Sequence, residues 1–287
     1  MKSKNTRIGM RVLLSLVAAL VLFSGCSSVV FDKKAVGKVK KVAVLVYTVP
    51  KSIQYYDDPK QRKRSLLQIA ASMANINNGQ NAATLSQKSF IEELNRQKLG
   101  FKAISRTEMM NNAAYLKISN KWVATRSKQK GTTSGLAKAA RIFGALSGSK
   151  SSEGVGPKGM PEFGLAGNWS AKSALTGGSG ELAYLKDAIA ALGVDAAIVI
   201  NDQGYSFGCE ACIGGTGSGS THTAFLISIV DRNGEEILGM REWFNFQPRS
   251  AAMVAYIINP LQHDSLFEGH GIKTAKVFAN LFRKESK

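Results

Sequence analysis

The spacing of apolar residues along the first third of the chain predicts a strand, helices and a second strand. A β-branched apolar run at 39–47, stopped by Pro50, is typical of a buried strand. Helical spacing predicts helices at about 65–76 and 82–98. Gly100 stands just past the second helix, where a left-handed residue commonly ends one. Residues 101–105 then alternate as a second strand, which completes a strand–helix–strand unit.

The last third of the chain also predicts strands and helices from the spacing of its apolar residues, in a different order. Ser179 is a candidate N-cap for a helix ending at Gly193, and 194–201 predicts a buried strand. After a glycine-rich loop, the expected elements are strands at 222–230 and 237–246 and a final helix at about 272–283. Asn233-Gly234 between these two strands is the strongest short hairpin signal.

Residues 107–178 differ from both flanks. Helical fragments at 109–123 are followed by a Gly- and Ser-rich stretch that cannot fill much core, and 134–146 fits a short basic amphipathic helix. That helix packs on its own domain or lies in a membrane interface. We therefore predict an α/β (α+β) domain over 39–287, with a long insertion at 107–178. Its mixed sheet has flanking helices, in two or three layers, and an antiparallel three-stranded end.

The amino-terminal segment has the pattern of an export signal. Residues 1–11 carry four basic and no acidic side chains, and the 12 residues 12–23 are almost purely apolar. This length fits a secretory signal and is too short to span a bilayer, which takes about 20 residues. Ser24-Gly25-Cys26 follows, so we expect residues 1–25 to be removed and 26–38 to form a basic tether. An ordinary secretory signal with an incidental cysteine is the alternative.

The net positive charge of the chain bears on which partners it could bind. The full chain has a net charge of +18, and without residues 1–25 it keeps 34 basic against 20 acidic residues, or +14. Such a balance attracts polyanions, and export favours anionic lipid or cell-wall material over nucleic acid. The basic residues form small dispersed clusters without interleaved aromatic residues, which favours a solvated surface.

Cys209 and Cys212 are the remaining thiols, and three arrangements stay open for them. An exported pair this close in sequence can be oxidised, so we predict a structural disulfide in the loop 201–222. Free thiols, or a redox or metal role, are the alternatives. A redox pair would start a helix, and zinc would need two further ligands, for which His222 is the one nearby candidate.

Two other sequence patterns give only weak evidence for a binding or catalytic site. The glycines at 214–219 lead into a strand and not into a helix N-terminus, so they predict a hairpin tip and not a phosphate loop. His263-Asp264-Ser265 are adjacent residues, which seldom point at one another as a triad requires, and His270 between two glycines suggests a loop. We find no catalytic motif and expect no enzymatic activity, cofactor or metal.

Four residues, Phe23-Ser24-Gly25-Cys26, resemble the lipobox of bacterial lipoproteins, with Phe23 where leucine is usual. The resemblance implies that Cys26 is lipidated and becomes the new amino terminus. Ser27, which follows it, implies the outer membrane.

Three further motifs resemble a group of envelope proteins: the strand at 39–47, the Gly193-Val194-Asp195 junction and the hairpin around 231–235. They are similar to motifs of the curli-secretion (CsgG-like) lipoproteins, the lipoprotein activators of penicillin-binding proteins and the TolB amino-terminal domain. The likeness covers roughly 39–105 and 179–284, and the insertion has no counterpart in it.

From this we expect a lipoprotein held on the outer membrane through Cys26 and facing the periplasm. It would act as a non-enzymatic binding or assembly module with an envelope protein partner, and a homo-oligomer is possible. The alternatives are a subunit of a curli-type secretion channel and a periplasmic hydrolase or thiol-redox enzyme.

Overall fold

The computed structural model describes residues 30–50, 52–56, 73–75, 79–131, 154–162, 181–213, 216–246 and 264–287. The strands are β1 (Val30–Phe31), β2 (Lys41–Pro50), β3 (Ser52–Tyr56), β4 (Met73–Asn75), β5 (Lys102–Ala103), β6 (Gly154–Val155), β7 (Ala196–Ile213), β8 (Thr216–Asp231) and β9 (Glu236–Phe246). The helices are α2 (Lys33–Val36), α4 (Gly79–Arg96), α5 (Arg106–Met110), α6 (Ala113–Gly131), α9 (Glu181–Leu192) and α11 (Asp264–Ser286).

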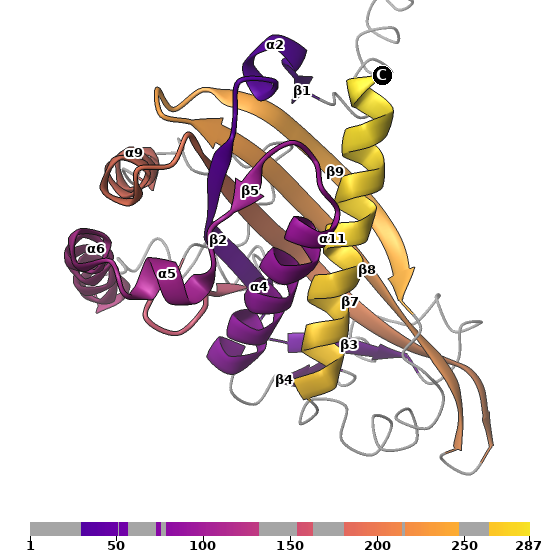
Figure 1. The fold of residues 1–287 in the computed structure, drawn as a ribbon. Helices are drawn as coiled ribbons and strands as arrows, with labels where there is room; N and C mark the ends of the chain where they lie inside the picture. Colours follow the sequence, from indigo (N-terminus) through magenta and orange to yellow (C-terminus); the bar gives the residue numbers. More distant parts are fainter. Residues whose placement is uncertain are drawn as a thin grey trace, which may run out of the picture.

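The strands form one mixed sheet in the order β1-β9-β8-β7-β2-β5 (Figure 1). Strand β2 runs parallel to β5 on one side and to β7 on the other, whereas β7, β8, β9 and β1 are antiparallel neighbours. Short strands flank this path: β3 pairs with β4 and β7, and β6 pairs with the end of β2. The predicted α/β class with an antiparallel end is confirmed.

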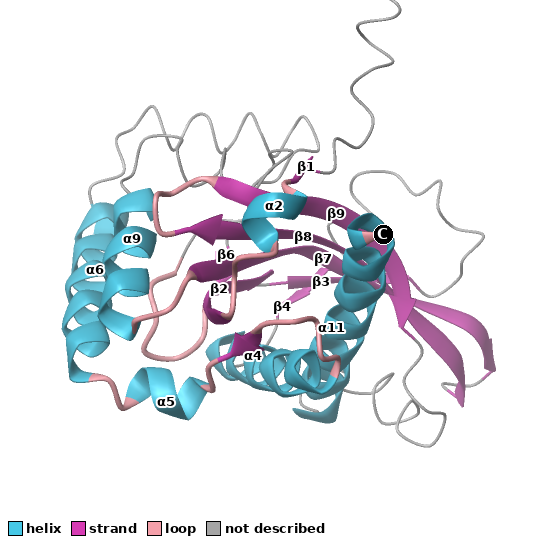
Figure 2. Cartoon of the chain, turned by 45° about the horizontal axis from the view of Figure 1, so that its top comes forward, coloured by secondary structure: helices cyan, strands magenta, loops and turns pink. Residues whose placement is uncertain are grey.

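Helices lie on both sides of the sheet (Figure 2). On the α4 and α11 side, Tyr47 of β2 meets Phe90 of α4 with ring centroids 6.0 Å apart, and Phe90 meets Phe278 of α11 at 6.4 Å. On the other side, α9 and α6 lie together, and Trp122 packs edge-on against Tyr184. Strand β2 is buried from Val42 to Val49 between these layers.

Small residues allow α4 and α11 to approach closely. Gly271 of α11 faces Ser86 and Ser89 of α4, and a Cβ at Gly271 would lie closer than 3.0 Å to both. Ser86 donates from Oγ to the carbonyl of Phe267 (3.0 Å), so the contact is also hydrogen-bonded. The two helices that cover this face of the sheet are therefore in close backbone contact at Gly271.

The hairpin expected at Asn233-Gly234 is present, with a different turn from a two-residue loop. Only Gly234 of this pair has a positive φ, of 86°. The carboxylate of Asp231 accepts from the backbone N–H groups of Asn233 and Glu235, both at 2.9 Å. Gly234 donates to the carbonyl of Asp231 and Asp231 donates to the carbonyl of Glu235 (both 2.9 Å), so the connection is a turn followed by a glycine bulge.

Several sequence predictions need correction. Residues 73–75, expected at the end of a helix, form strand β4. The final helix begins at Asp264, eight residues before Ile272, and His270 is a buried helical residue and not a loop residue. Residues 106–131 form two helices, one of 19 residues, so the start of the insertion is more regular than expected. The expected amphipathic helix at 134–146 lies outside the described residues.

Two boundaries also move. Residues 30–38, predicted as tether, include β1 and α2, so the fold extends at least to Val30. The predicted loop at 201–222 is mostly strand, because β7 continues to Ile213 and β8 starts at Thr216. Glycine and serine lower strand propensity, but continuous pairing between two long strands outweighs it. Over the described ranges, the helices are too short or too polar to cross a membrane.

We predict that Gly271→Ala destabilises the domain by at least about 2 kcal/mol, although alanine is the better helix former by about 1 kcal/mol. The added methyl group would collide with Ser86 and Ser89 and push the two helices apart. Urea unfolding measures the change, with Lys276→Ala at an exposed position of the same helix as control. A Gly271→Ala protein as stable as the control would contradict the close crossing.

Candidate functional site

The cysteines predicted as site residues are described in part. Cys26 lies outside the described residues. Cys209 and Cys212 both lie in β7, opposite Gly219 and Gly217 of β8, and the backbone alone is described there. In a regular strand, residues three apart lie about 10 Å apart, beyond the reach of about 7 Å that a disulfide allows. The irregular pairing between Cys209 and Ala211 interrupts this regular spacing, and the disulfide stays a prediction.

The three histidines are not brought together by the described chain. His222 is in β8 opposite Ser206, His263 lies outside the described residues, and His270 is buried in α11 beside Thr274. Among the residues that the structure covers, His, Cys, Asp and Glu nowhere gather in a group that could hold a metal ion. The side chains of Cys209, Cys212 and His222 lie outside the described part, so the zinc hypothesis at His222 stays untested.

The structure instead reveals a polar cluster around Arg106, which we call the Arg106 hub and define as Gln87, Arg106, Lys158 and Met160. Arg106 donates from Nη1 to Gln87 Oε1 (2.7 Å) and to Met160 Sδ (3.2 Å), and from Nη2 to the carbonyl of Lys158. Gln87 in turn donates to the carbonyl of Val44 in β2 (2.7 Å). One guanidinium thus joins α4, α5 and the segment 154–162 beside the central strand.

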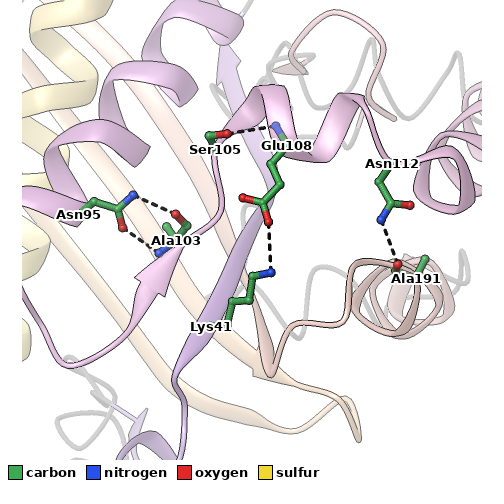
Figure 3. Close-up of polar contacts among 7 residues, drawn as sticks. All are labelled: Lys41, Asn95, Ala103, Ser105, Glu108, Asn112 and Ala191. Carbon is green, nitrogen blue, oxygen red and sulfur yellow. Dashed lines mark hydrogen bonds and ion pairs between the residues drawn. The ribbon is translucent and has the colours of Figure 1, made fainter.

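Contacts of the residues on either side of Arg106, drawn in Figure 3, explain its position. Strand β5 ends at Ala103, whose backbone is held on both sides by the Asn95 amide at 2.8 and 2.9 Å. Ser105 then caps α5 by accepting from the N–H of Glu108 (3.0 Å), as expected of a Ser-x-x-Glu sequence. The carboxylate of Glu108 pairs with Lys41 at 3.1 Å, which ties this turn to β2.

A second group of polar residues lies between α6, α9 and the segment 154–162. The hydroxyl groups of Tyr115 and Tyr184 are 3.1 Å apart, and Ser119 donates to the carbonyl of Gly159 (3.0 Å). Burial raises the pKa of both tyrosines, so both stay protonated at neutral pH. Asn112, at the start of α6, donates to the carbonyl of Ala191 at the end of α9 (3.3 Å; Figure 3).

The segment 154–162, which the hub holds, reaches a position that often binds ligands in other α/β proteins. In open sheets, ligands bind beyond the carboxyl ends of parallel strands, where the strand order reverses. Here the order reverses at β2, and β6 pairs with the carboxyl end of β2, whereas the hub itself lies beside Val44 inside that strand. A segment of the same chain lies at this place: β6 pairs with β2, and the backbone N–H of Lys158 donates to Thr84 (3.0 Å).

The chemistry of the hub is that of a structural clamp. Burial lowers the pKa of Arg106, but a guanidinium still remains charged at neutral pH and cannot act as a base. Its hydrogen-bond partners within the described chain are an amide, a carbonyl and a thioether, all of them neutral. These groups fix positions and transfer no protons. No sequence signal reveals the hub, because Gln87, Arg106 and Met160 belong to unrelated local patterns.

Asp195 organises the opposite end of the parallel strands. Its Oδ2 accepts from the backbone N–H groups of Lys40 (2.9 Å) and Lys41 (3.0 Å), and its Oδ1 pairs with Arg232 (2.9 Å). The two backbone donors, chiefly that of Lys40, lower the pKa of Asp195, and Arg232 lowers it further. The predicted Gly193-Val194-Asp195 junction is therefore present, with Gly193 at a φ of 60°.

Comparison with known proteins identifies no relative. No family model matches the chain, and no curated protein and no solved structure is significantly similar to it. The resemblance to curli-secretion and related lipoproteins remains a similarity of short motifs.

We predict that Arg106→Met lowers the free energy of unfolding by about 2 kcal/mol, because Gln87 and the carbonyl of Lys158 lose a charged donor. Urea unfolding measures this, and Lys121→Met, at an exposed position of α6, is the control. Trypsin should also cleave the variant faster after Lys158, because the segment 154–162 loses a clamp. Equal stability and equal cleavage in variant and control would contradict this role.

A second prediction concerns pH. The pKa of Asp195 is lowered by folding, so its contribution to stability is complete above the unfolded-state pKa of about 4 and disappears as the pH falls through the folded-state pKa. Asp195→Asn should cost about 1 kcal/mol at pH 7, and the gap to wild type should narrow below about pH 4. Unfolding curves from pH 7 to pH 3 test this, and a gap that does not change with pH would contradict it.

Proposed function

We propose that the chain is a lipoprotein of the outer membrane that faces the periplasm and acts as a non-enzymatic binding or assembly module of the cell envelope. The observation that carries the proposal is the amino-terminal pattern: a basic segment, 12 apolar residues, two small residues and Cys26. A cysteine that carries several acyl chains anchors a protein stably, since each buried CH₂ contributes about 0.8 kcal/mol.

The fold supports a binding role. The hub and the Tyr115–Tyr184 pair hold elements in place, and the position beyond the parallel strands holds the chain's own residues 154–162. A module of this kind presents a rigid surface to a protein partner. We propose an envelope protein as that partner.

A curli-type channel subunit, the alternative, would need strands that cross a bilayer. Strand β7 is flanked by β3 up to Gly208, and β8 is flanked by β9 from Thr221 onward. Among the described residues, the part of the hairpin without a third strand comprises five residues on each strand, Cys209–Ile213 and Thr216–Ser220. Five residues span about 17 Å, whereas the hydrocarbon core is about 30 Å thick and takes about 9–11 tilted residues. The rest of β7 and β8 pairs with β2, β3 and β9 in the sheet of the domain, and this pairing is the reason for preferring the binding module.

Two measurements test the proposal. A palmitate analogue should label the wild-type chain and Cys209→Ala, and it should leave Cys26→Ala unlabelled. Crosslinking in intact envelopes, followed by purification under denaturing conditions, should recover one stoichiometric protein partner with the wild type and lose it with Cys26→Ala. Equal labelling of all three proteins would reject the anchor. Absence of a partner, together with turnover of a generic hydrolase or thiol-redox substrate by the purified chain, would reject the binding module.

A further inference from the structure

The described fold reaches to within a few residues of the proposed anchor, Cys26. Val30 and Phe31 form β1, which pairs with Gly239 and Leu238 of β9. Phe31 packs edge-on against Phe282 of α11, with ring centroids 5.7 Å apart, and the next residue donates from its N–H to the carbonyl of Ile237 (2.9 Å). The start of the chain is therefore fastened to the body of the domain.

The distance from the anchor follows from chain length. Val30 is four positions after Cys26, and four residues extend over at most about 14 Å. A domain anchored at Cys26 must therefore hold β1 within about 14 Å of the bilayer surface. The Debye length at physiological ionic strength is about 8 Å, so long basic side chains that extend from this end toward the bilayer come within range of its surface potential.

This end of the molecule is rich in exposed basic side chains. It comprises α2 and the residues after it, the connection from α4 to β5, and the end of α11, which lie together in Figure 1. Hydrogen bonds join these segments: Lys33 Nζ donates to the carbonyl of Lys287 (3.2 Å), and Arg283 Nη2 donates to the carbonyl of Gln97 (2.7 Å). The exposed basic residues, which we call the basic end, are Lys33, Lys34, Lys38, Lys40, Lys98, Lys102, Arg283 and Lys284.

Few acids offset this charge. Asp32 and Glu285 are the acidic residues on the same segments, and Asp32 caps α2 by accepting from Ala35. Asp195 beside Lys40 is already paired with Arg232. Asp231 at the nearby turn accepts from the turn's own backbone. The eight cationic side chains of the basic end thus outnumber the two acidic residues on the same segments, Asp32 and Glu285.

We infer that the basic end docks on the anionic phospholipid headgroups of the leaflet that carries the anchor. The inference rests on the proposed acylation of Cys26 for its geometry, and on the charge of the basic end for its chemistry. Acyl chains supply affinity without orientation, whereas a basic face beside the anchor orients the domain. The opposite end, with the hairpin tip of β7 and β8, then points away from the membrane toward a partner.

The test uses the full mature chain with Cys26→Ser, so that no lipid contributes, and vesicles of 30% phosphatidylglycerol in phosphatidylcholine. The test variant carries Lys33→Glu, Lys34→Glu, Lys98→Glu and Lys284→Glu. The matched control carries Lys88→Glu, Lys117→Glu, Lys121→Glu and Lys276→Glu, which changes the net charge equally at exposed positions elsewhere. Each basic residue near an anionic surface strengthens binding about fivefold. Sedimentation at low salt should therefore show at least tenfold weaker binding for the test variant than for the control.

Three results would overturn the inference. One is failure of the Cys26→Ser chain to bind these vesicles in preference to pure phosphatidylcholine. The second is equal weakening in both fourfold variants, which would indicate a response to net charge alone. The third is binding that persists in 0.5 M salt. Circular dichroism confirms that each variant is folded, and Lys33→Gln with Lys284→Gln serves as a milder pair, expected to weaken binding severalfold.

The outcome is separate from that of the proposed function. Loss of acyl labelling with intact vesicle binding would reject the anchor and keep the basic end. Acyl labelling without vesicle binding would keep the anchor and reject the docking face.

Discussion

The parallel pairing of β2 with β7 is the constraint on which the rest of the structure depends. The two strands are separated by about half of the chain, and they lie side by side over Val42–Thr48 and Ala196–Asn201. Asp195 sets the register at the start of this pairing. Its carboxylate accepts from two backbone N–H groups at the start of β2, and its own N–H donates to the carbonyl of Lys41 (2.8 Å). Parallel strands need a crossover connection, so helices must lie on both faces.

The arrangement of the helices follows from that pairing. Strand β5 extends the sheet on one side of β2 and β7 on the other, so the crossovers of α4 and α9 cover opposite faces. The described parts of the insertion add Met109, Tyr115 and Met160 to the main core, and directional polar contacts hold them as well. Arg106 holds the segment 154–162 through Lys158 and Met160, and Asn112 joins α6 to α9. A charged donor with neutral partners is directional, which suits a clamp more than a catalyst.

The two ends of the sheet differ in chemistry. At the end nearest the proposed anchor, α2 and the end of α11 place exposed lysines and an arginine around β1. At the far end, β7 and β8 run beyond the body of the domain as a narrow hairpin that contains both cysteines. In the arrangement that we propose, the first end would face the membrane and the second a partner.

Local pattern was sufficient for the elements with strong periodicity. The buried run of β2, the helix at 79–96, the Gly193 stop and the hairpin at Gly234 could all be predicted, because each depends on side chains or backbone angles within a few residues. The export pattern ending at Cys26 is likewise a property of the sequence alone.

Tertiary structure decided the rest. The glycine-rich stretch after Asn201 is mostly strand because it pairs with its neighbour, and His270 is buried because Gly271 lets α11 approach α4. The Arg106 hub joins residues up to 73 positions apart, and the basic end joins the two termini of the domain. Contacts between distant segments leave no periodic trace in a sequence, since each partner satisfies only its own local pattern, and for that physical reason only the fold could reveal them.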